Sequence, residues 1–326
     1  MRTTAILLLC ASLAGCGRKQ PNPPHPQPWI FHDPASYPPF DGAKALLYVR
    51  QQTAFGPRVP GAPAHEQCLN FLRTELAKCA PKVREQKFSM TGYDGALLHL
   101  TNLIDSFLPE AKTRMMLCAH WDSRPRADEE PDSADALRPI PGANDGASGV
   151  AVLLHIASIL AQHPPPVGVD LVFFDGEDYG KKSDLHFYCL GSKYFSTDLS
   201  PDYRPEFGIL LDMVGDLHAR FPKEGYSRLF APEIVELIWS SARKIGSTHF
   251  IDEPYAEIFD DHHSLNTMAG IKTVDIIDAS MVGNTDADTT RRYWHTLDDT
   301  ADTCSAETLG SVGHVLLYII YGLVPV

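Results

Sequence analysis

Several features that are typical of other classes of protein are missing from this chain of 326 residues. None of its 7 cysteines stands in a Cys-x-x-Cys pair, which argues against a zinc site built from thiolates. Basic residues are few, with 28 Lys and Arg against 41 Asp and Glu and a formal net charge of −13. A surface that binds the phosphates of a nucleic acid needs an excess of basic residues, so we expect no nucleic-acid partner.

The chain also lacks an apolar run long enough to cross a membrane as an ordinary helix. The C-terminal run LLYIIYGLVPV has 11 residues and predicts the core-facing end of a helix. The N-terminal run AILLLCASLAGC follows a short basic start and is typical of a secretory signal. It ends in Leu-Ala-Gly-Cys16, which resembles a bacterial lipobox, although a plain signal peptide with a chance cysteine is the alternative.

We therefore expect residues 1–16 to be a lipoprotein signal peptide whose Cys16 is lipidated. Residues 17–40 hold eight prolines and cannot sustain a helix or a central strand, which favours an extended tether. The remaining residues, 41–326, would form the folded domain. These predictions imply an exported bacterial lipoprotein on the periplasmic or cell-surface face of a membrane.

Apolar periodicity in the domain alternates between helix and strand. Helices are expected at residues 65–79, 146–162, 231–246 and 305–322, and strands at 96–104, 113–121, 167–174, 207–215 and 271–277. Several strands are apolar on both faces, and neither an internal repeat nor a domain boundary is evident. The pattern predicts a single α/β domain whose mostly parallel or mixed central sheet carries helices on both faces.

Polar side chains follow the predicted strands directly. They are His120 and Asp122, then Asp175, Glu177 and Asp178, then Asp212, and last Asp275. In open α/β sheets the binding crevice lies beyond the carboxyl ends of the strands, so these segments should deliver carboxylates and imidazoles to one edge. Zinc accepts such ligands, and a catalytic zinc keeps one position open.

Some candidates have plainer explanations when each is taken alone. Asp145 precedes a predicted helix and could be its N-cap rather than a ligand. His295 could be a packed core histidine. The acidic loops DEEPDSAD, residues 128–135, and NTDADTT, residues 284–290, could bind calcium, but neither has EF-hand spacing and solvated loops are expected. The second of these loops could also form a rim of the site.

The combined motifs HWD, GANDGASG, FFDGED, LLDMVGD, FDDHH and YWHTLDD resemble the zinc aminopeptidase superfamily and, within it, the glutaminyl cyclases. The resemblance covers most of the chain from about residue 43 onward. Two features are similar to the cyclases in particular. A long insert, YGKKSDLHFYCL, separates Glu177-Asp178 from the following Gly-Ser turn, and Trp294 directly precedes His295.

This resemblance implies an activity and a set of roles. The enzyme would convert the N-terminal glutamine of peptides or proteins into pyroglutamate with release of ammonia. One zinc ion per chain would be held by Asp145, Asp178 and His295. Glu177 would be the general base and acid, Asp212 and Asp260 the buried acids that share its proton network, and Trp294 part of the substrate pocket.

The chain departs from the family in two places. Glutamate is common in the superfamily where Asp178 stands, so the chain must approach the zinc more closely here. Asp275 stands where the animal cyclases carry a histidine, which puts that part of their proton network in doubt.

Two other functions remain open at this point. A di-zinc aminopeptidase would place a second zinc on His120 and Asp212, with Asp145 bridging the two ions. A non-catalytic surface lipoprotein that binds peptides is the other alternative, although unpaired buried acids would only destabilise such a protein.

Overall fold

The fold is built around a six-stranded mixed sheet. A computed structural model describes residues 29–79, 83–182 and 184–325 of the chain. The strand order across the sheet is β2 (Arg84–Thr91), β3 (Leu97–Phe107), β5 (Gly168–Phe174), β4 (Arg114–His120), β6 (Phe207–Asp212) and β9 (Thr273–Ile277). Pairing is antiparallel from β2 to β5 and parallel from β5 to β9.

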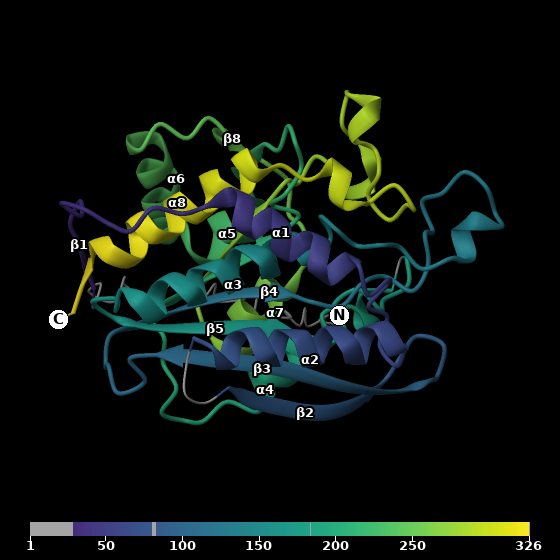
Figure 1. Ribbon diagram of the computed structural model, residues 1–326, viewed down its shortest axis with the longest axis horizontal. Coiled ribbons are helices and arrows are strands. Elements are labelled where there is room, and N and C mark those ends of the chain that lie inside the picture. The colour runs from purple at the N-terminus through teal and green to yellow at the C-terminus, as the bar shows by residue number, and fades with distance from the viewer. Residues whose placement is uncertain (1–28, 80–82, 183, 326) are drawn as a thin grey trace, which may run out of the picture.

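Helices cover both faces of this sheet, as the sequence predicts. One face is covered by α1 (Gly42–Thr53), α2 (Pro63–Ala77), α3 (Ala147–Gln162), α6 (Pro232–Lys244) and α8 (Ala306–Gly322). The other face carries α4 (Leu190–Thr197) and the short α7 (Asp261–Ser264). Figure 1 looks onto the first face, with α2 and α3 crossing in front of the strands.

The core is divided by the sheet because neighbouring residues of a strand point to opposite faces. Leu117 of β4 and Leu171 of β5 belong to the larger cluster under α1, α3 and α8. Their neighbours Cys118 and Val172 pack on the α4 side with Phe195. All of these side chains are almost fully buried. The central strands are therefore apolar on both faces, which is the pattern that predicted a covered sheet.

The predicted helices and strands of the domain are confirmed, but the periodicity missed several other elements, among them strand β2 and helix α1. Strand β2 went unrecognised because it lies at the sheet edge and exposes charged residues such as Glu85 and Lys87 among its apolar ones. Helix α1 begins at Gly42, and Asp41 caps it by accepting the backbone N–H groups of Ala43 and Lys44. Its burial is limited to a narrow stripe, so its apolar periodicity is weak.

The folded domain begins before residue 41. Strand β1 (Ile30–Phe31) pairs with β10 (Leu323–Val324) near the C-terminus, and Trp29 packs edge-on against Phe207 at 5.5 Å. The described part of the predicted tether, residues 29–40, thus lies against the domain. Residues 1–28, with the predicted signal peptide and Cys16, fall outside the described residues. No helix in the described part of the chain is long and apolar enough to cross a membrane.

The parallel strands end together at one edge, where the polar side chains were expected. His120 is the last residue of β4, Asp212 is the last of β6, and Asp175 directly follows β5. The prediction that Asp275 lies at this edge is wrong. Strand β9 continues through Ile277, so Asp275 is buried in mid-strand. The strand continues because Ile276 and Ile277 keep pairing with β6.

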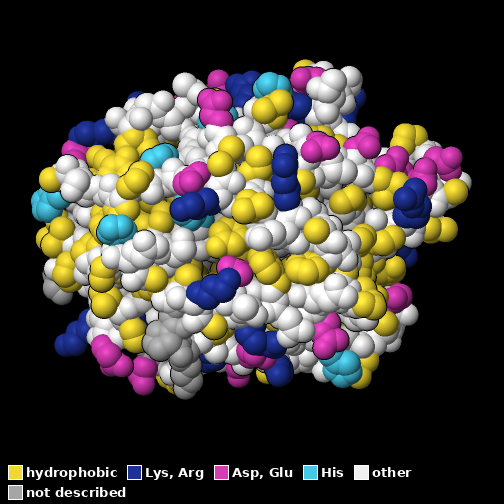
Figure 2. Space-filling model, in the orientation of Figure 1, with side chains coloured by type: hydrophobic (Ala, Val, Ile, Leu, Met, Phe, Trp, Pro, Cys, Tyr) yellow, Lys and Arg dark blue, Asp and Glu magenta, His cyan; other side chains and the backbone are white. Residues whose placement is uncertain are grey.

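Two further elements flank this edge. The short strands β7 (Phe221–Lys223) and β8 (Phe250–Pro254) form a parallel pair, and α5 (Gly225–Phe230) follows β7. On the face seen in Figure 2, acidic side chains gather at the right-hand end, over the loop that contains residues 128–135. The carboxyl edge of the sheet is therefore framed by loops and by the β7–β8 pair.

Candidate metal centre and active site

Asp145, Asp178 and His295 meet at the carboxyl edge of the sheet. One ligand atom from each lies within 4.8 Å of the others, and all three side chains are buried. His295 Nε2 is 3.5 Å from Asp145 Oδ2 and 3.5 Å from Asp178 Oδ1. Ligands about 2.0–2.1 Å from a tetrahedral zinc stand roughly 3.3 Å apart, so these separations fit such an ion. Asp178 Oδ2 is buried without a hydrogen-bond partner, which is the state expected of an atom that binds a metal.

A braced turn holds Asp145 in place. Gly146 adopts the left-handed region with φ of 97°, and the Asp299 carboxylate accepts the backbone N–H groups of Asn144 at 2.7 Å and Asp145 at 3.1 Å. The residue that caps α3 is Gly146, and no side chain makes a capping hydrogen bond there. The capping explanation for Asp145 is therefore wrong, and its carboxylate is left to face the cluster.

The three acids after β5 divide into a brace and two site residues. Asp175 accepts the Thr101 N–H at 2.7 Å and contacts His65 Nε2 at 2.8 Å, which ties the turn to the neighbouring strand. Asp122 braces the same turn, because its two oxygens accept the backbone N–H groups of Glu177 at 3.0 Å and Asp178 at 3.1 Å. This leaves the Glu177 and Asp178 side chains to point into the site.

Arg124 is a site residue that the sequence did not reveal. It is only 1% exposed, and its guanidinium donates to Asp178 Oδ1 at 2.7 Å, to both oxygens of Asp128 at 2.7 Å and to the Tyr188 hydroxyl at 2.9 Å. It therefore compensates two buried carboxylates and links them to the insert. An arginine two residues after Asp122 looks like any surface arginine in the sequence, so only its burial identifies it.

His295 is held as a neutral imidazole. Its backbone φ is 55°, its ring stacks on Trp294 with centroids 3.5 Å apart, and its Nδ1 lies 3.6 Å from Asp128 Oδ1. Burial, and then the positive charge of Arg124, hold the pKa of His295 well below its usual value. The neutral imidazole is the form that binds a metal.

A second cluster adjoins the first and includes His120, Asp145 and Asp212. His120 Nε2 lies 3.2 Å from Asp145 Oδ1 and 3.2 Å from Asp212 Oδ1. Burial alone would lower the pKa of His120, but the Asp122, Asp145 and Asp212 carboxylates raise it well above its usual value. The same residues suit either a protonated histidine between carboxylates or the second metal of an aminopeptidase.

Glu177 lies among acids that cannot all be ionised at low cost. Burial raises its pKa well above the usual value, and the charges of Asp178 and Asp260 raise it further. Burial and the nearby Asp212 raise the pKa of Asp260 to about 7, and burial also raises the pKa of Asp212. The Cys189 thiol, from the end of the insert, donates to Glu177 Oε1 at 3.2 Å.

A buried histidine stands behind Asp260. His262 Nε2 lies 3.1 Å from Glu224 Oε2, and His262 Nδ1 lies 3.6 Å from Asp275 Oδ2. All three side chains are 0% exposed. Burial, and then the neighbouring Asp260 charge, raise the pKa of Asp275 well above its usual value, so this position favours a neutral carboxyl.

A small cavity of about 70 Å³ opens above the metal cluster. Its walls are Asp145, Glu177, Asp178, Tyr188, Asp212, Met213, Ile258, Phe259, Asp260, Ile277, Val282, Trp294 and His295. All of the residues predicted for catalysis, metal binding and substrate contact line it, except the alternative ligand His120, which lies just behind. Tyr188 brings the insert into the wall.

The fold and this cluster define a zinc-dependent enzyme of the aminopeptidase-like class. Residues 102–320 match the model of peptidase family M28. The chain therefore belongs to peptidase family M28, and the resemblance read from the motifs is confirmed.

Solved structures with high similarity cover nearly the whole domain. A glutaminyl cyclase from Bacteroides thetaiotaomicron, bound to N-acetylhistamine, is 43% identical with a TM-score of 0.83, over 88% of this chain and 99% of that one. A leucine aminopeptidase precursor from Bacteroides thetaiotaomicron VPI-5482 is 42% identical with a TM-score of 0.81, over 88% of this chain and 98% of that one. Both kinds of enzyme thus stand among the relatives.

A curated relative gives a more distant match. Glutaminyl-peptide cyclotransferase from Bos taurus is 24% identical over 250 residues, which is 66% of this chain. The match spans 64% of the length of the bovine protein, just under two thirds.

Proposed function

We propose that this protein is a glutaminyl-peptide cyclotransferase that acts on peptides or proteins with N-terminal glutamine. The observation that carries the proposal is the cavity, where the insert residue Tyr188 and Trp294 enclose only about 70 Å³ above the metal cluster. A space of this size suits one residue folded back on itself. Relatives with the cyclase activity support the same conclusion.

The reaction joins the α-amino nitrogen of glutamine to its own γ-carbonyl carbon and breaks the bond from that carbon to the amide nitrogen. Asp145, Asp178 and His295 would hold a zinc ion, which would supply Lewis acidity towards the γ-carbonyl oxygen when bound. Glu177 takes a proton from the α-amine and returns it to the departing nitrogen, which leaves as ammonia. Because the attack is intramolecular, the aromatic walls mainly hold the reactive conformer.

Asp212 and Asp260 share one proton with Glu177 in this proposal. Their raised pKa values mean that the group is not fully ionised near neutral pH, so a proton is available close to Glu177. His120 would then donate to Asp145 and Asp212 instead of binding a second ion, since it lies 3.2 Å from each. One zinc ion per chain is expected.

A di-zinc aminopeptidase is the second candidate. It is favoured by the cluster of His120, Asp145 and Asp212 and by the relative named as a leucine aminopeptidase precursor. Such an enzyme would activate water between two ions rather than the amine of its substrate.

One experiment separates these functions. The purified protein is incubated with a peptide that begins with glutamine and, separately, with a leucine-initiated peptide, while zinc per chain is measured by mass spectrometry. Ammonia release from the first peptide, an intact second peptide and one zinc ion support the cyclase. Stepwise removal of N-terminal residues together with two zinc ions would establish the aminopeptidase instead.

We also propose that the protein is exported and anchored by a lipid on Cys16. The support is the apolar N-terminal run that ends in Leu-Ala-Gly-Cys16 and the proline-rich segment that follows it. In a bacterial host, labelled fatty acid should be incorporated into the full chain and not into Cys16→Ser, which should leave the membrane fraction. Equal labelling of both proteins would overturn this proposal.

A further inference from the structure

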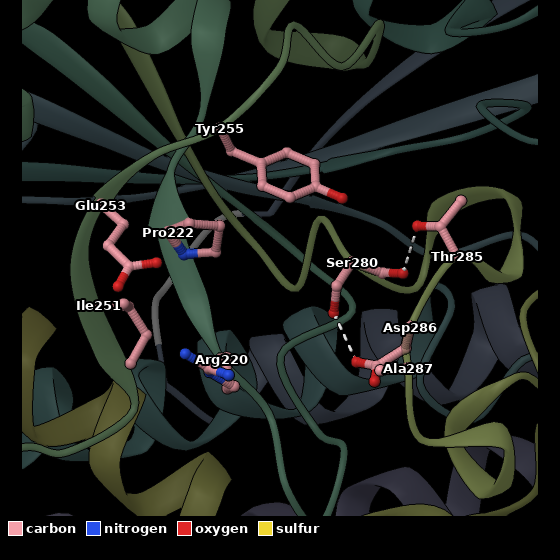
Figure 3. A pocket seen from close by; sticks show the side chains of 9 residues that line it. All are labelled: Arg220, Pro222, Ile251, Glu253, Tyr255, Ser280, Thr285, Asp286 and Ala287. Atoms are coloured by element: carbon pink, nitrogen blue, oxygen red, sulfur yellow. Dashed lines mark hydrogen bonds between the residues drawn. The ribbon is translucent and has the colours of Figure 1, made fainter.

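A second cavity, of about 280 Å³, lies outside the catalytic machinery. Figure 3 shows Pro222, Ile251 and Glu253 on its β7–β8 side and the loop that carries Ser280 and Asp286 on the other. The ring of Tyr255 lies between the two sides at one end. This cavity is larger than the catalytic one, so it has room for more than one side chain.

The two cavities share a wall. Tyr255 and Ser280 line the second cavity, and their near neighbours in the chain, Ile258 and Val282, line the catalytic cavity. Tyr255, Ile258, Val282 and Trp294 pack on one small hydrophobic cluster with Met213 and Ile277. The two cavities therefore lie on either side of the same small hydrophobic cluster.

The loop that forms the outer wall, residues 280–287, is held rigidly. Arg291 is 5% exposed and pairs with Asp216 at 2.9 Å, and it also pairs with Asp278 and Asp286. Ser280 Oγ donates to Asp286 Oδ2 at 2.9 Å. The acidic segment NTDADTT, expected as a loop that could rim the site, therefore presents a preformed surface in which the Asp286 charge is compensated.

Unpaired polar groups remain on the other walls. The Arg220 guanidinium is exposed, and within residues 29–79, 83–182 and 184–325 no carboxylate pairs with it. The Tyr255 hydroxyl has no hydrogen-bond partner within the same residues. Pro222, Ile251 and the Tyr255 ring add apolar surface beside these groups. The cavity thus offers an apolar wall, the Arg220 cation and, on its β8 side, the Glu253 carboxylate.

We propose that this cavity binds the residues that follow the N-terminal glutamine of the substrate, and that it prefers an apolar side chain followed by an acidic one. The catalytic cavity, at about 70 Å³, holds only the first residue, so the following residues must cross its rim. The apolar side chain would pack on Pro222, Ile251 and Tyr255, and the carboxylate would pair with Arg220. The inference rests on the proposed cyclase function.

Three substrates test this proposal: glutamine amide, Gln-Phe-Glu-Ala amide and Gln-Phe-Gln-Ala amide. The acidic peptide should have the highest kcat/KM. Arg220→Gln should lower kcat/KM for the acidic peptide about three- to tenfold through KM, and should leave the other two substrates unchanged, as expected for the loss of a rim charge. Tyr255→Ala should lower kcat/KM for both peptides but not for glutamine amide.

Two matched variants complete the design. Glu253→Gln removes a negative charge from the same cavity and should raise kcat/KM for the acidic peptide. Arg204→Gln removes an exposed arginine just before β6, at the opposite edge of the sheet, and should change nothing.

The outcomes separate the two proposals. Two results would overturn only the proposed role of the second cavity and leave the cyclase function standing. One is cyclisation of all three substrates with equal kcat/KM, and the other is a fall in kcat/KM in Arg220→Gln that is the same for every substrate. No ammonia from any of the three would overturn the proposed function, and the inference with it.

Discussion

Asp178 has one oxygen bound by a buried arginine and one oxygen without any hydrogen-bond partner among the described residues. At the scale of single residues this division leaves one oxygen of a buried carboxylate available to a metal ion. Arg124 compensates the charge and fixes the orientation of the carboxylate, and the oxygen that it binds, Oδ1, lies 3.5 Å from His295 Nε2. Asp128, held by the same arginine, lies 3.6 Å from His295 Nδ1 and orients the ring.

Arg124→Met should therefore weaken zinc binding. Removing the guanidinium leaves Asp128 and Asp178 free to turn, and the loss of such outer contacts typically lowers metal affinity about 10–100-fold. Zinc affinity measured with a competing chelator should fall by this amount, and excess zinc should restore part of the activity. Arg138→Met is the control, since Arg138 is 63% exposed and, among the residues that the structure describes, pairs only with Asp135. Equal zinc affinity in both variants would contradict the role of Arg124.

Glu177→Gln should remove proton transfer and little else. The amide cannot accept the α-amine proton, so kcat should fall about 10²–10⁴-fold while zinc content stays unchanged. The turn after β5 should keep its conformation. Asp122 accepts the backbone N–H groups of Glu177 and Asp178, and the Glu177 side chain takes no part in these hydrogen bonds. Activity within about tenfold of the parent, with zinc still bound, would show that another group moves the proton.

At the scale of secondary structure, one buried glutamate joins three segments around Asp260. Glu224 caps α5 by accepting the N–H groups of Tyr226 and Ser227, accepts the Ile258 N–H at 2.8 Å, and contacts His262 of α7. Burial would raise its pKa, but the His262 bond and charge and the backbone N–H groups lower the pKa to about 2. The ionised form is therefore strongly favoured in the folded protein.

This predicts a pH-dependent contribution to stability. Because the folded-state pKa lies below the unfolded value, the contribution is complete above about pH 4.5 and is lost as the pH falls towards 2. Glu224→Gln should lower the free energy of unfolding by about 2–3 kcal/mol at pH 7 and by much less near pH 2.5. Urea titrations at both pH values measure it, with the exposed Glu110→Gln as control. An equal loss at the two pH values would contradict the assignment.

The elements also show where sequence patterns stop being informative. The helix over residues 147–162 and the strand over 168–174 are strongly apolar, and burial against neighbours on all sides matches that pattern. Strand β2 has no apolar side chain in its first four residues and buries only Gln86 and Phe88 at an exposed edge, so its apolar pattern is weak. Asp275 was grouped with the strand-end acids, but it lies inside the strand predicted over residues 271–277, which pairs with β6 as far as Ile277.

At the scale of the whole molecule, the first and last described segments of the chain pack against each other. Residues 29–40 lie across the C-terminal helix, with Trp29 and Phe40 buried and β1 paired to β10. Tyr318 and Lys244 both contact Asp33 in this segment. The segment that follows the predicted signal is thus partly a structural strap rather than only a spacer.

A chain that starts at residue 29 keeps the whole described strap and serves as the reference, beside one that starts at residue 17. A chain that starts at residue 41 should lose on the order of 2–4 kcal/mol in the free energy of unfolding. The buried side chains of Trp29 and Phe40 are lost, and this loss is partly offset because residues 29–40 no longer pay the entropy of being ordered. Thermal unfolding of the three proteins at one protein concentration checks this. Identical midpoints for the chains starting at 29 and 41 would show that the strap contributes nothing.

The sequence by itself determined the α/β class and the identity of the residues at the carboxyl edge, because apolar runs and strand-end acids are local patterns. It also indicated zinc, since the order of Asp145, Asp178 and His295 matches a known arrangement. Tertiary structure alone decided that Arg124 is buried against Asp178, that Asp122 braces the turn after β5, and that a second cavity adjoins the first. These facts depend on which distant segments meet, and a buried charge differs from an exposed one only through its neighbours.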